Sequence, residues 1–294
     1  MSVPTVAPAG TGWQARLSLR FEPGPRGATR LAHNRHEGPL RLIRSLPQPD
    51  GRCDAVIVHP PGGLVGGDAL RLELSLAAES RVLCTTPGAQ KWYRSPGAGA
   101  VAHTRVEVGA GAALEWLPQP AIVYDGARVE QSIEFALAAD ARLLGWEGMV
   151  LGRAAMGERF GRGRLRQRVS LAVDGHPAWV EHTDADADDR LFASPLGWGG
   201  RTAACTVWAL APAGAWSETL ADAWREALEA ACEAAAGRRV RLDAGASRVA
   251  PGLLAARVLA DDAEVAMRAA HALWLLARPA VLGASSPPPR IWAT

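Results

Sequence analysis

The most constraining feature of this chain is a strand-like alternation of apolar and polar residues from Trp13 to about Leu210. Glycine and proline interrupt the alternation every few residues, and helical periodicity is nearly absent from this part. Two packed β-layers or a coil of stacked strands would bury such a pattern, whereas alternating strands and helices would not produce it. The sequence therefore predicts a mainly β fold. The clearest predicted strands cover residues 16–21, 70–76, 101–108, 129–137 and 164–173.

A turn is predicted at Asp125-Gly126, between the apolar run 122–124 and the segment that begins at Val129. Glycine accepts a positive φ, so this dipeptide is typical of a β-hairpin. We expect the two flanking segments to pair with each other.

Two helices are predicted in the C-terminal third, at about 217–236 and 262–278. Ser217 is a good N-cap for the first helix, which is amphipathic and ends at Gly237. The second helix is apolar around most of its circumference, with its polar residues on one narrow stripe. A helix of this kind is buried on several sides or covered by another chain, and the pattern leaves both options open.

The remaining organisation follows from composition. We expect a flexible N-terminus over residues 1–12 and a single domain over 13–294, β-rich to residue 212, with an extended tail over 284–294. The sequence shows no signal peptide and no run of about 18 uninterrupted apolar residues. This indicates a soluble, cytoplasmic protein that does not enter a membrane.

Charge and lysine content exclude several functions. Lys and Arg total 32 against 30 for Asp and Glu, which is far from the balance of a dedicated nucleic-acid binder. The chain has one lysine, Lys91, and it follows Gln90, so the Gly-Lys-Ser/Thr of a phosphate-binding P-loop is absent from the sequence. Cys53, Cys84, Cys205 and Cys232 form no C-x-x-C pair and are predicted to be reduced, mostly buried thiols.

Two charged segments allow more than one interpretation. Glu181, His182 and Asp184 have the side-chain types of a cation site or of a metal-dependent hydrolase, although charged runs are usually only solvated. Arginines alternate from Arg162 to Arg168, so a strand there would place four guanidinium groups on one face. That face is a solvated edge, a dock for an acidic partner, or, in a rival reading, a nucleic-acid surface.

Three loop segments carry the strongest motifs: HPPGGLVGGD at 59–68, TTPGAQKWYRS at 85–95 and EGMVLGRAAMGERF at 147–160. Together with the ending PRIW at 289–292, they resemble the UreD (UreH) family of urease accessory proteins. The motif positions taken as candidate site residues are His59, Pro60, Pro61, Gly62, Gly63, Gly66, Gly67, Asp68, Thr86, Pro87, Gly88, Lys91, Tyr93, Arg94, Gly152, Arg153, Gly157 and Glu158.

The resemblance implies a non-enzymatic protein that joins UreF and UreG on apo-urease, where nickel is inserted while UreG hydrolyses GTP. It implies a stacked two-layer, β-helix-like arrangement of short strands with a pair of helices. It also implies a dimer of the UreD–UreF–UreG unit, no tightly bound cofactor, no nucleotide on this chain, and transient nickel passing through an internal channel.

Nickel that passes through a protein needs weak oxygen or imidazole contacts, because a closed thiolate site would trap it. The candidate residues for this path are Asp68, Glu147, Glu158, Glu181 and His182. Candidate contacts with UreF are Trp274 and Leu275 on the second helix and Trp292 in the tail.

Overall fold

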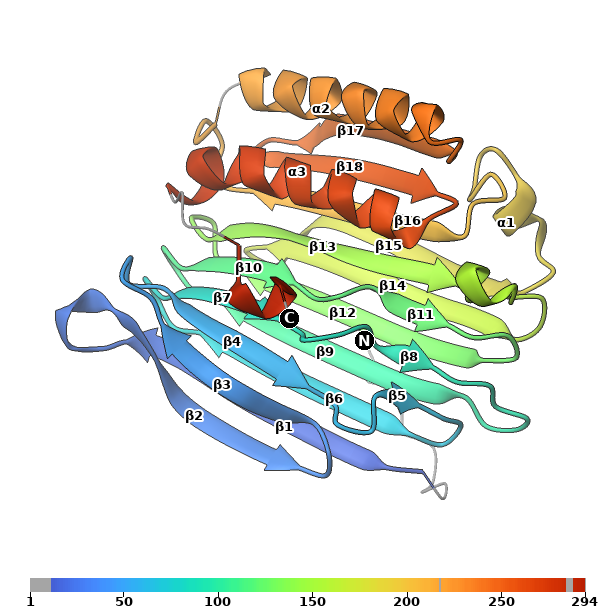
Figure 1. Ribbon diagram of the computed structural model, residues 1–294. Helices are drawn as coiled ribbons and strands as arrows, with labels where there is room; N and C mark the ends of the chain where they lie inside the picture. The colour runs from blue at the N-terminus through green and yellow to red at the C-terminus, as the bar shows by residue number, and fades with distance from the viewer. Residues whose placement is uncertain (1–11, 217, 284–287, 294) are drawn as a thin grey trace.

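The structure, a computed structural model, describes residues 12–216, 218–283 and 288–293. Its strands form two facing sheets (Figure 1). Sheet A contains β1 (Gln14–Pro23), β2 (Thr29–Glu37), β6 (Ala69–Leu76), β9 (Ala100–Val108), β12 (Arg128–Leu137), β14 (Arg164–Val173) and β15 (His176–Asp186). Sheet B contains β3 (Arg41–Pro47), β4 (Cys53–Val58), β7 (Arg81–Thr85), β10 (Ala113–Leu117), β13 (Arg142–Leu151), β16 (Ala203–Leu210), β17 (Leu242–Ala250) and β18 (Leu253–Ala260).

The chain winds as a coil of stacked strands. Strands β6, β9, β12 and β14 are parallel neighbours in sheet A, and β4, β7, β10 and β13 are parallel neighbours in sheet B. Short strands β5 (Gly63–Leu64), β8 (Lys91–Trp92) and β11 (Ala121–Val123) also belong to sheet B: they pair with one another, and β11 pairs with β13. The coils that begin with β4, β7 and β10 each hold a long sheet B strand, a short strand and a sheet A strand, and β13 and β14 form the next coil. This confirms the predicted β-helix-like, two-layer fold.

The expected hairpin at Asp125-Gly126 is wrong. Gly126 does adopt a positive φ of 79°, but the turn joins β11 to β12, which lie in different sheets. Strand β11 pairs with β8 and β13 instead. The turn is a corner of the coil, because each strand finds its partners in the preceding and following coils.

Alternating side chains from both sheets meet in the core. In β6, Leu70, Leu72, Leu74 and Leu76 are buried while the residues between them are half-buried on the outer face. Strand β16 departs from alternation because all eight of its residues are buried. Sheet A packs on one face of sheet B and the helices pack on the other, so strands such as β16 are apolar on both faces.

Helices α2 (Glu218–Gly237) and α3 (Ala263–Leu282) lie on the outer face of sheet B (Figure 1). Helix α3 begins with the Asp262 carboxylate accepting the backbone N–H of Glu264 and Val265. It runs to Leu282, four residues beyond the predicted end, through Pro279. The predicted N-cap Ser217 lies outside the described residues, as do residues 1–11 and 284–287 of the predicted terminal segments.

Helix α3 is mainly a core helix. It is long and apolar enough to span a membrane by composition, yet half of its most apolar stretch is buried inside the protein. Its buried residues pack on β13, β16 and β18 and against Trp224 of α2. The sequence left open whether this helix is buried in the protein or covered by another chain. Most of the helix is buried in the core, and Leu275 and Leu276 remain half-exposed.

A buried charged cluster joins α3 to sheet B. Glu115 on β10 is 2% exposed and accepts two hydrogen bonds from Arg278, at 2.7 and 2.9 Å. The Trp274 indole N–H donates to the same carboxylate at 2.8 Å, and Arg52 donates at 3.2 Å. Arg52 is also paired with Asp54 at 2.7 Å. Each buried charge therefore has a partner, as burial requires.

The C-terminal segment η3 (Arg290–Ala293) packs beside this cluster, over β7 and β10 (Figure 1). The Trp292 ring stacks on His271 of α3 with centroids 4.8 Å apart, and its N–H donates to Thr85 at 2.9 Å. Trp292 therefore anchors the end of the chain to the protein itself, between helix α3 and sheet B.

Candidate functional site

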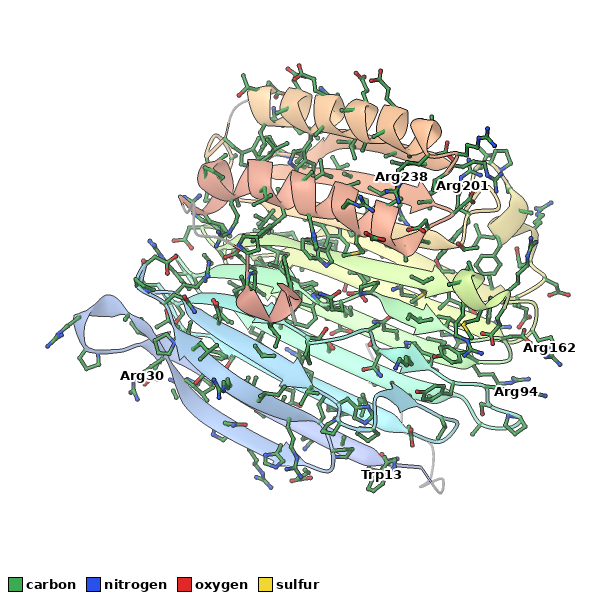
Figure 2. The ribbon with its side chains drawn as sticks, viewed as in Figure 1. Trp13, Arg30, Arg94, Arg162, Arg201 and Arg238 are labelled. Atoms are coloured by element: carbon green, nitrogen blue, oxygen red, sulfur yellow. The ribbon has the colours of Figure 1, made fainter. Side chains whose placement is uncertain are left out.

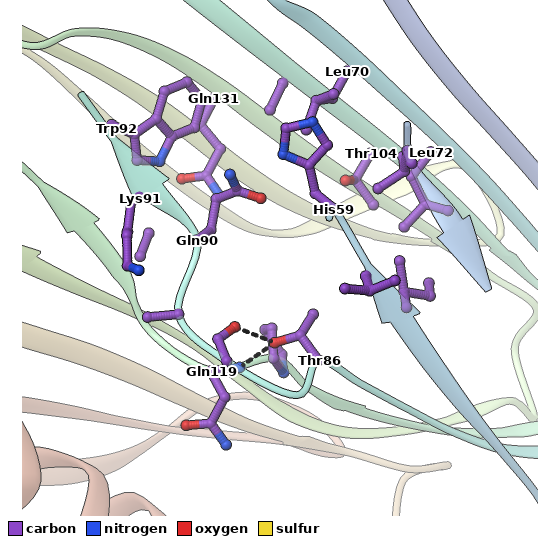
Figure 3. A pocket seen from close by; sticks show the side chains of 18 of the residues that line it. His59, Leu70, Leu72, Thr86, Gln90, Lys91, Trp92, Thr104, Gln119 and Gln131 are labelled. Carbon is purple, nitrogen blue, oxygen red and sulfur yellow. Dashed lines mark hydrogen bonds between the residues drawn. The ribbon is translucent and has the colours of Figure 1, made fainter. Parts of the chain in front are cut away.

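A cavity of about 360 Å³ lies between the two sheets. Its wall includes polar side chains from both sheets and from the motif loops, as Figure 3 shows for His59, Gln90, Trp92 and Gln131. Several of these have buried polar atoms without a hydrogen-bond partner: both ring nitrogens of His59, one carboxylate oxygen of Glu147, and side-chain nitrogens of Gln90, Trp92 and Trp116. A cavity of this size with unpartnered polar groups can hold water or a hydrated ion.

The first two sequence motifs build one side of this cavity. His59, Pro60 and Gly62 of the first motif and Thr86, Pro87, Gly88 and Lys91 of the second line it. Thr86 holds its loop by accepting the Gln119 backbone N–H at 2.9 Å (Figure 3). Burial lowers the pKa of His59, which favours the neutral imidazole that binds metal ions.

The glycines of the first motif allow the two loops to touch. A Cβ on Gly63 would overlap the Tyr93 ring, and one on Gly66 would overlap Ser95. Gly67 has a φ of 92°, a backbone conformation that residues with a side chain rarely adopt. The motif is therefore explained by close packing of consecutive coils at this corner.

Asp68 has a structural role rather than a place on the cavity wall. It is 2% exposed, and its carboxylate accepts the backbone N–H of Trp13 at 2.7 Å and of Val65 at 2.8 Å. Both of its oxygens hold the loop closed, and its negative charge acts on His59 of the cavity wall. The place of Asp68 on a nickel path stays a prediction.

A row of polar side chains continues from the cavity into the sandwich. In sheet B, Glu147 of β13 is aligned with Thr206 of β16, and Thr206 with Arg257 of β18. In sheet A, Gln131 of β12 is aligned with Gln167 of β14. All five side chains occupy inward-facing positions at which the neighbouring inward residues are mostly apolar.

Hydrogen bonds join the side chains of this region in two groups, which meet at the lining of a small chamber. Gln167 donates to Gln131 at 3.1 Å, and Gln131 donates to Glu147 at 3.0 Å. Glu181, on strand β15 of sheet A, also faces inward. Its carboxylate accepts a hydrogen bond from Thr206 at 3.0 Å and forms an ion pair with Arg257 at 2.5 Å. We call these six residues, Gln167, Gln131, Glu147, Thr206, Glu181 and Arg257, the interior polar chain. All of them except Gln131 line a second, much smaller chamber, and Gln131 and Glu147 line the cavity.

Glu147 lies where the two spaces meet, because it lines both the cavity and the small chamber. The pKa of Glu147 is raised to about 7: burial is the main cause, the side-chain N–H groups of Gln131 and Trp116 oppose the rise, and the nearby Glu181 carboxylate adds to it. Near neutral pH this carboxyl group therefore exchanges readily between its neutral and charged forms.

Two other predicted nickel-path residues lie elsewhere. Glu158 is a surface residue of the third motif: it pairs with Arg153 at 2.5 Å and accepts the Asp125 backbone N–H at 3.2 Å. His182 follows Glu181 on β15, so it points to the outer face of sheet A. Only Glu147 and Glu181 of the five candidates meet inside the protein.

The third motif supports a corner of the coil. Its Arg153 guanidinium lies 4.3 Å from the centre of the Tyr124 ring, and Tyr124 packs edge-on against Tyr93 of the second motif. Gly152 permits this turn, since a Cβ there would meet the backbone of Arg159. Gly157 adopts a φ of 71° at the end of the short η2 turn (Ala154–Met156).

The hydrolase cluster is not assembled. Glu181 faces inward, whereas Asp184 faces outward and forms ion pairs with Arg164 at 2.8 Å and Arg166 at 3.2 Å. Within the described ranges, no group of three or more His, Cys, Asp or Glu side chains is placed to hold a metal ion. The alternation over 162–168 does put Arg164, Arg166 and Arg168 on the outer face of β14.

Arg162 precedes β14 and pairs with Asp125, so it is not part of the outer face of that strand. Arg162 and Arg94 both project at the end of the sandwich where the coil corners lie (Figure 2). Ion pairing with neighbouring carboxylates neutralises most of this arginine-rich segment, which is typical of a solvated surface.

The predicted partner contacts have different surroundings. Trp274 is fully buried and offers no surface to another chain, so its assignment to a partner contact is corrected. Leu275 is 50% exposed, and Leu276 beside it is 42% exposed. Trp292 is half-buried against His271, as described above.

All four cysteines are free, and Cys53, Cys84 and Cys205 are buried. Burial raises the pKa of the Cys53 thiol to about 11 and that of Cys84 to about 12. Such thiols stay protonated near neutral pH and are poor metal ligands.

Sequence reasoning missed Gln131, Gln167, Thr206 and Arg257. The sequence did contain a signal for the two glutamines, because each replaces an apolar residue in the inward-facing set of its strand. Gln131 lies between Val129 and Ile133, and Gln167 lies between Leu165 and Val169. Thr206 and Arg257 are each the one polar residue of an otherwise apolar strand, but a strand that is apolar on both faces does not show which face that residue occupies.

The fold and the interior polar chain define a β-solenoid protein whose candidate site lies between its sheets. A family model described as UreD urease accessory protein matches residues 14–293. The chain is 43% identical to the urease accessory protein UreD of an Azoarcus species, covering 96% of this chain and 95% of that one. It is 39% identical to UreD of Delftia acidovorans, with 99% and 98% covered, and 39% identical to UreD of Dechloromonas aromatica, with 96% and 95% covered.

The chain therefore belongs to the UreD family of urease accessory proteins, and its role is in urease maturation.

Proposed function

We propose that this protein is a non-enzymatic scaffold that joins UreF and the GTPase UreG on apo-urease and conducts Ni²⁺ through its interior. The observation that supports a conduit is the interior polar chain, which leads from the cavity to Arg257 on β18. We further propose that the protein works in the cytoplasm, as a dimer of the UreD–UreF–UreG unit, without a tightly bound cofactor, a nucleotide of its own, nucleic acid or a membrane.

The donors along this route suit a transient cation. His59 offers an imidazole at the cavity, Gln131 and Gln167 offer amide oxygens, and Glu147 and Glu181 offer carboxylates. Imidazole and oxygen donors bind nickel, but thiolates would hold it more firmly. Because the donors are spread along the route, an ion can exchange one contact for the next.

The test is the nickel content of urease matured in cells that carry all other maturation components. We expect Glu147→Gln and Glu181→Gln each to lower bound nickel and urease activity several-fold, because each removes a charged oxygen donor from the route. His182→Ala is the matched control, since His182 was selected by the same sequence argument but faces outward. Unchanged nickel in both glutamine variants, with the complex still assembled, would mean that nickel does not take this route.

The exposed pair Leu275 and Leu276 on α3 is the part of the predicted UreF contact that remains on the surface. We expect Leu275→Asp to leave the protein folded, with a stability change of under about 1 kcal/mol, and to abolish co-purification with UreF. Trp274→Asp is expected to unfold the protein, because Trp274 is fully buried. Co-purification of a folded Leu275→Asp variant at the normal level would remove this face from the interface.

A further inference from the structure

The end of the interior polar chain is closed by an arginine. Sheet A ends at β15, whereas sheet B continues beyond β16 through β18 and β17. Arg257 lies on the inward face of β18, and its side chain, 42% exposed, reaches from solvent to the Glu181 carboxylate, which is 16% exposed. Arg257 therefore lies at the boundary between the small chamber and the outside.

The charges around this chamber are few and can be counted by element. Glu147 comes from β13, Glu181 from β15 and Arg257 from β18, while Thr206, Thr183 and Gln167 are neutral. The chamber thus holds two carboxyl groups and one guanidinium, and the guanidinium is paired with Glu181. Glu147 accepts a hydrogen bond from Gln131 through one oxygen, and its other oxygen is buried without a direct hydrogen-bond partner.

A divalent cation would meet the same donors. The Glu181 oxygens that now accept from Arg257 and Thr206 are hard oxygen donors, like the free oxygen of Glu147. A cation that binds Glu181 is repelled by a guanidinium on the same carboxylate. The partial exposure of Arg257 gives its long side chain a solvated position into which it can move.

We infer that Arg257 is an internal counter-ion of the interior path: its guanidinium occupies Glu181 when no metal is present, and a divalent cation must displace it to bind Glu181 and Glu147. Return of the guanidinium then expels the ion. Arg257 thereby keeps the affinity of this chamber for metal low, as a site that must release its cargo requires. This inference rests on the proposed nickel route and assigns the residue that regulates it.

The test is Ni²⁺ binding to the purified full-length chain, measured by equilibrium dialysis with Ni²⁺ alone. We expect Arg257→Gln to bind Ni²⁺ at least about tenfold more tightly than the unaltered protein, equivalent to about 1.4 kcal/mol. Arg248→Gln is the matched control, because Arg248 on β17 is also about half-exposed and paired with a glutamate, Glu218, but lies away from the chamber. It should leave the affinity unchanged.

Two further variants make the result specific. Adding Glu147→Gln to Arg257→Gln should remove the gain, because one of the two carboxylates is then neutral. Arg257→Lys keeps a cation at this position and should give a Ni²⁺ affinity close to that of the unaltered protein. This variant also tests the counter-ion role if Arg257→Gln does not fold. Equal affinity of Arg257→Gln and the unaltered protein, or a gain in Arg257→Lys as large as in Arg257→Gln, would overturn the inference.

The two proposals can fail separately. If Arg257→Gln binds Ni²⁺ more tightly while Glu147→Gln and Glu181→Gln both leave the nickel content of urease unchanged, the counter-ion role holds and the nickel route is wrong. If Glu147→Gln lowers urease nickel while Arg257→Gln does not change Ni²⁺ affinity, the route holds and the counter-ion role is wrong.

Discussion

Replacing Glu115 with leucine is expected to lower the free energy of unfolding by about 3–5 kcal/mol, because it leaves the Arg278 guanidinium buried without its carboxylate. Arg278 is 1% exposed, so water cannot replace the lost partner. The Trp274 indole N–H loses its acceptor as well. Urea unfolding followed by tryptophan fluorescence measures the change.

The double variant Glu115→Leu/Arg278→Met should recover much of this loss, since it removes both buried charges and fills the space with apolar groups. Arg268→Ala is the control on the same helix: its ion pair with Glu264 is exposed, and its loss should cost under about 0.5 kcal/mol. Additive losses in the double variant would show that the two buried residues do not act as a pair.

Replacing Glu147 with glutamine is expected to stabilise the protein at pH 8 by roughly 3 kcal/mol and to change little at pH 4.5. The folded-state pKa of about 7 lies above the ordinary value of 4.5, so the folded protein retains a proton that the unfolded chain releases. This contribution to stability is present below pH 4.5 and is lost as pH rises through 7. Glutamine is neutral at every pH and can still accept the hydrogen bond from Gln131.

Denaturant unfolding of both proteins from pH 4.5 to 8 measures this effect as the difference between two curves, so other titrating groups cancel. Glu134→Gln, on the outer face of β12 and exposed, should give a curve parallel to that of the unaltered protein. A difference between Glu147→Gln and the unaltered protein that does not vary with pH would mean that Glu147 is charged throughout. Greater stability together with poorer nickel insertion would separate the role of Glu147 in the route from its effect on folding.

Local patterns in the sequence determined the class of fold. Alternation with period two requires each strand to bury one face, and the frequent glycines and prolines limit strand length, so short stacked strands were the predicted outcome. The two helices were predicted for the same reason, from a period near 3.6. The motif loops were also visible, because glycines such as Gly63 and Gly66 are needed wherever two coils touch.

The tertiary structure decided which strands pair with each other and what covers the apolar helix. Asp125-Gly126 has the same local conformation in a hairpin and in a coil corner, so the dipeptide could not reveal that β11 and β12 belong to different sheets. Likewise, an apolar helix has the same sequence whether a sheet or another chain covers it, and only the packing of α3 on sheet B separated buried Trp274 from exposed Leu275.

The candidate site depended on tertiary structure even more strongly. Sequence selected five acidic or histidine residues by type, but strand register assigned Glu181 to the interior and its neighbour His182 to the outer face. The interior polar chain consists of two hydrogen-bonded groups, each of which links the facing sheets: Gln131 bonds Glu147, and Arg257 bonds Glu181. Both groups line the small chamber. Periodicity along one strand determines which side chains point inward, whereas the stacking of separate strands decides which of them meet.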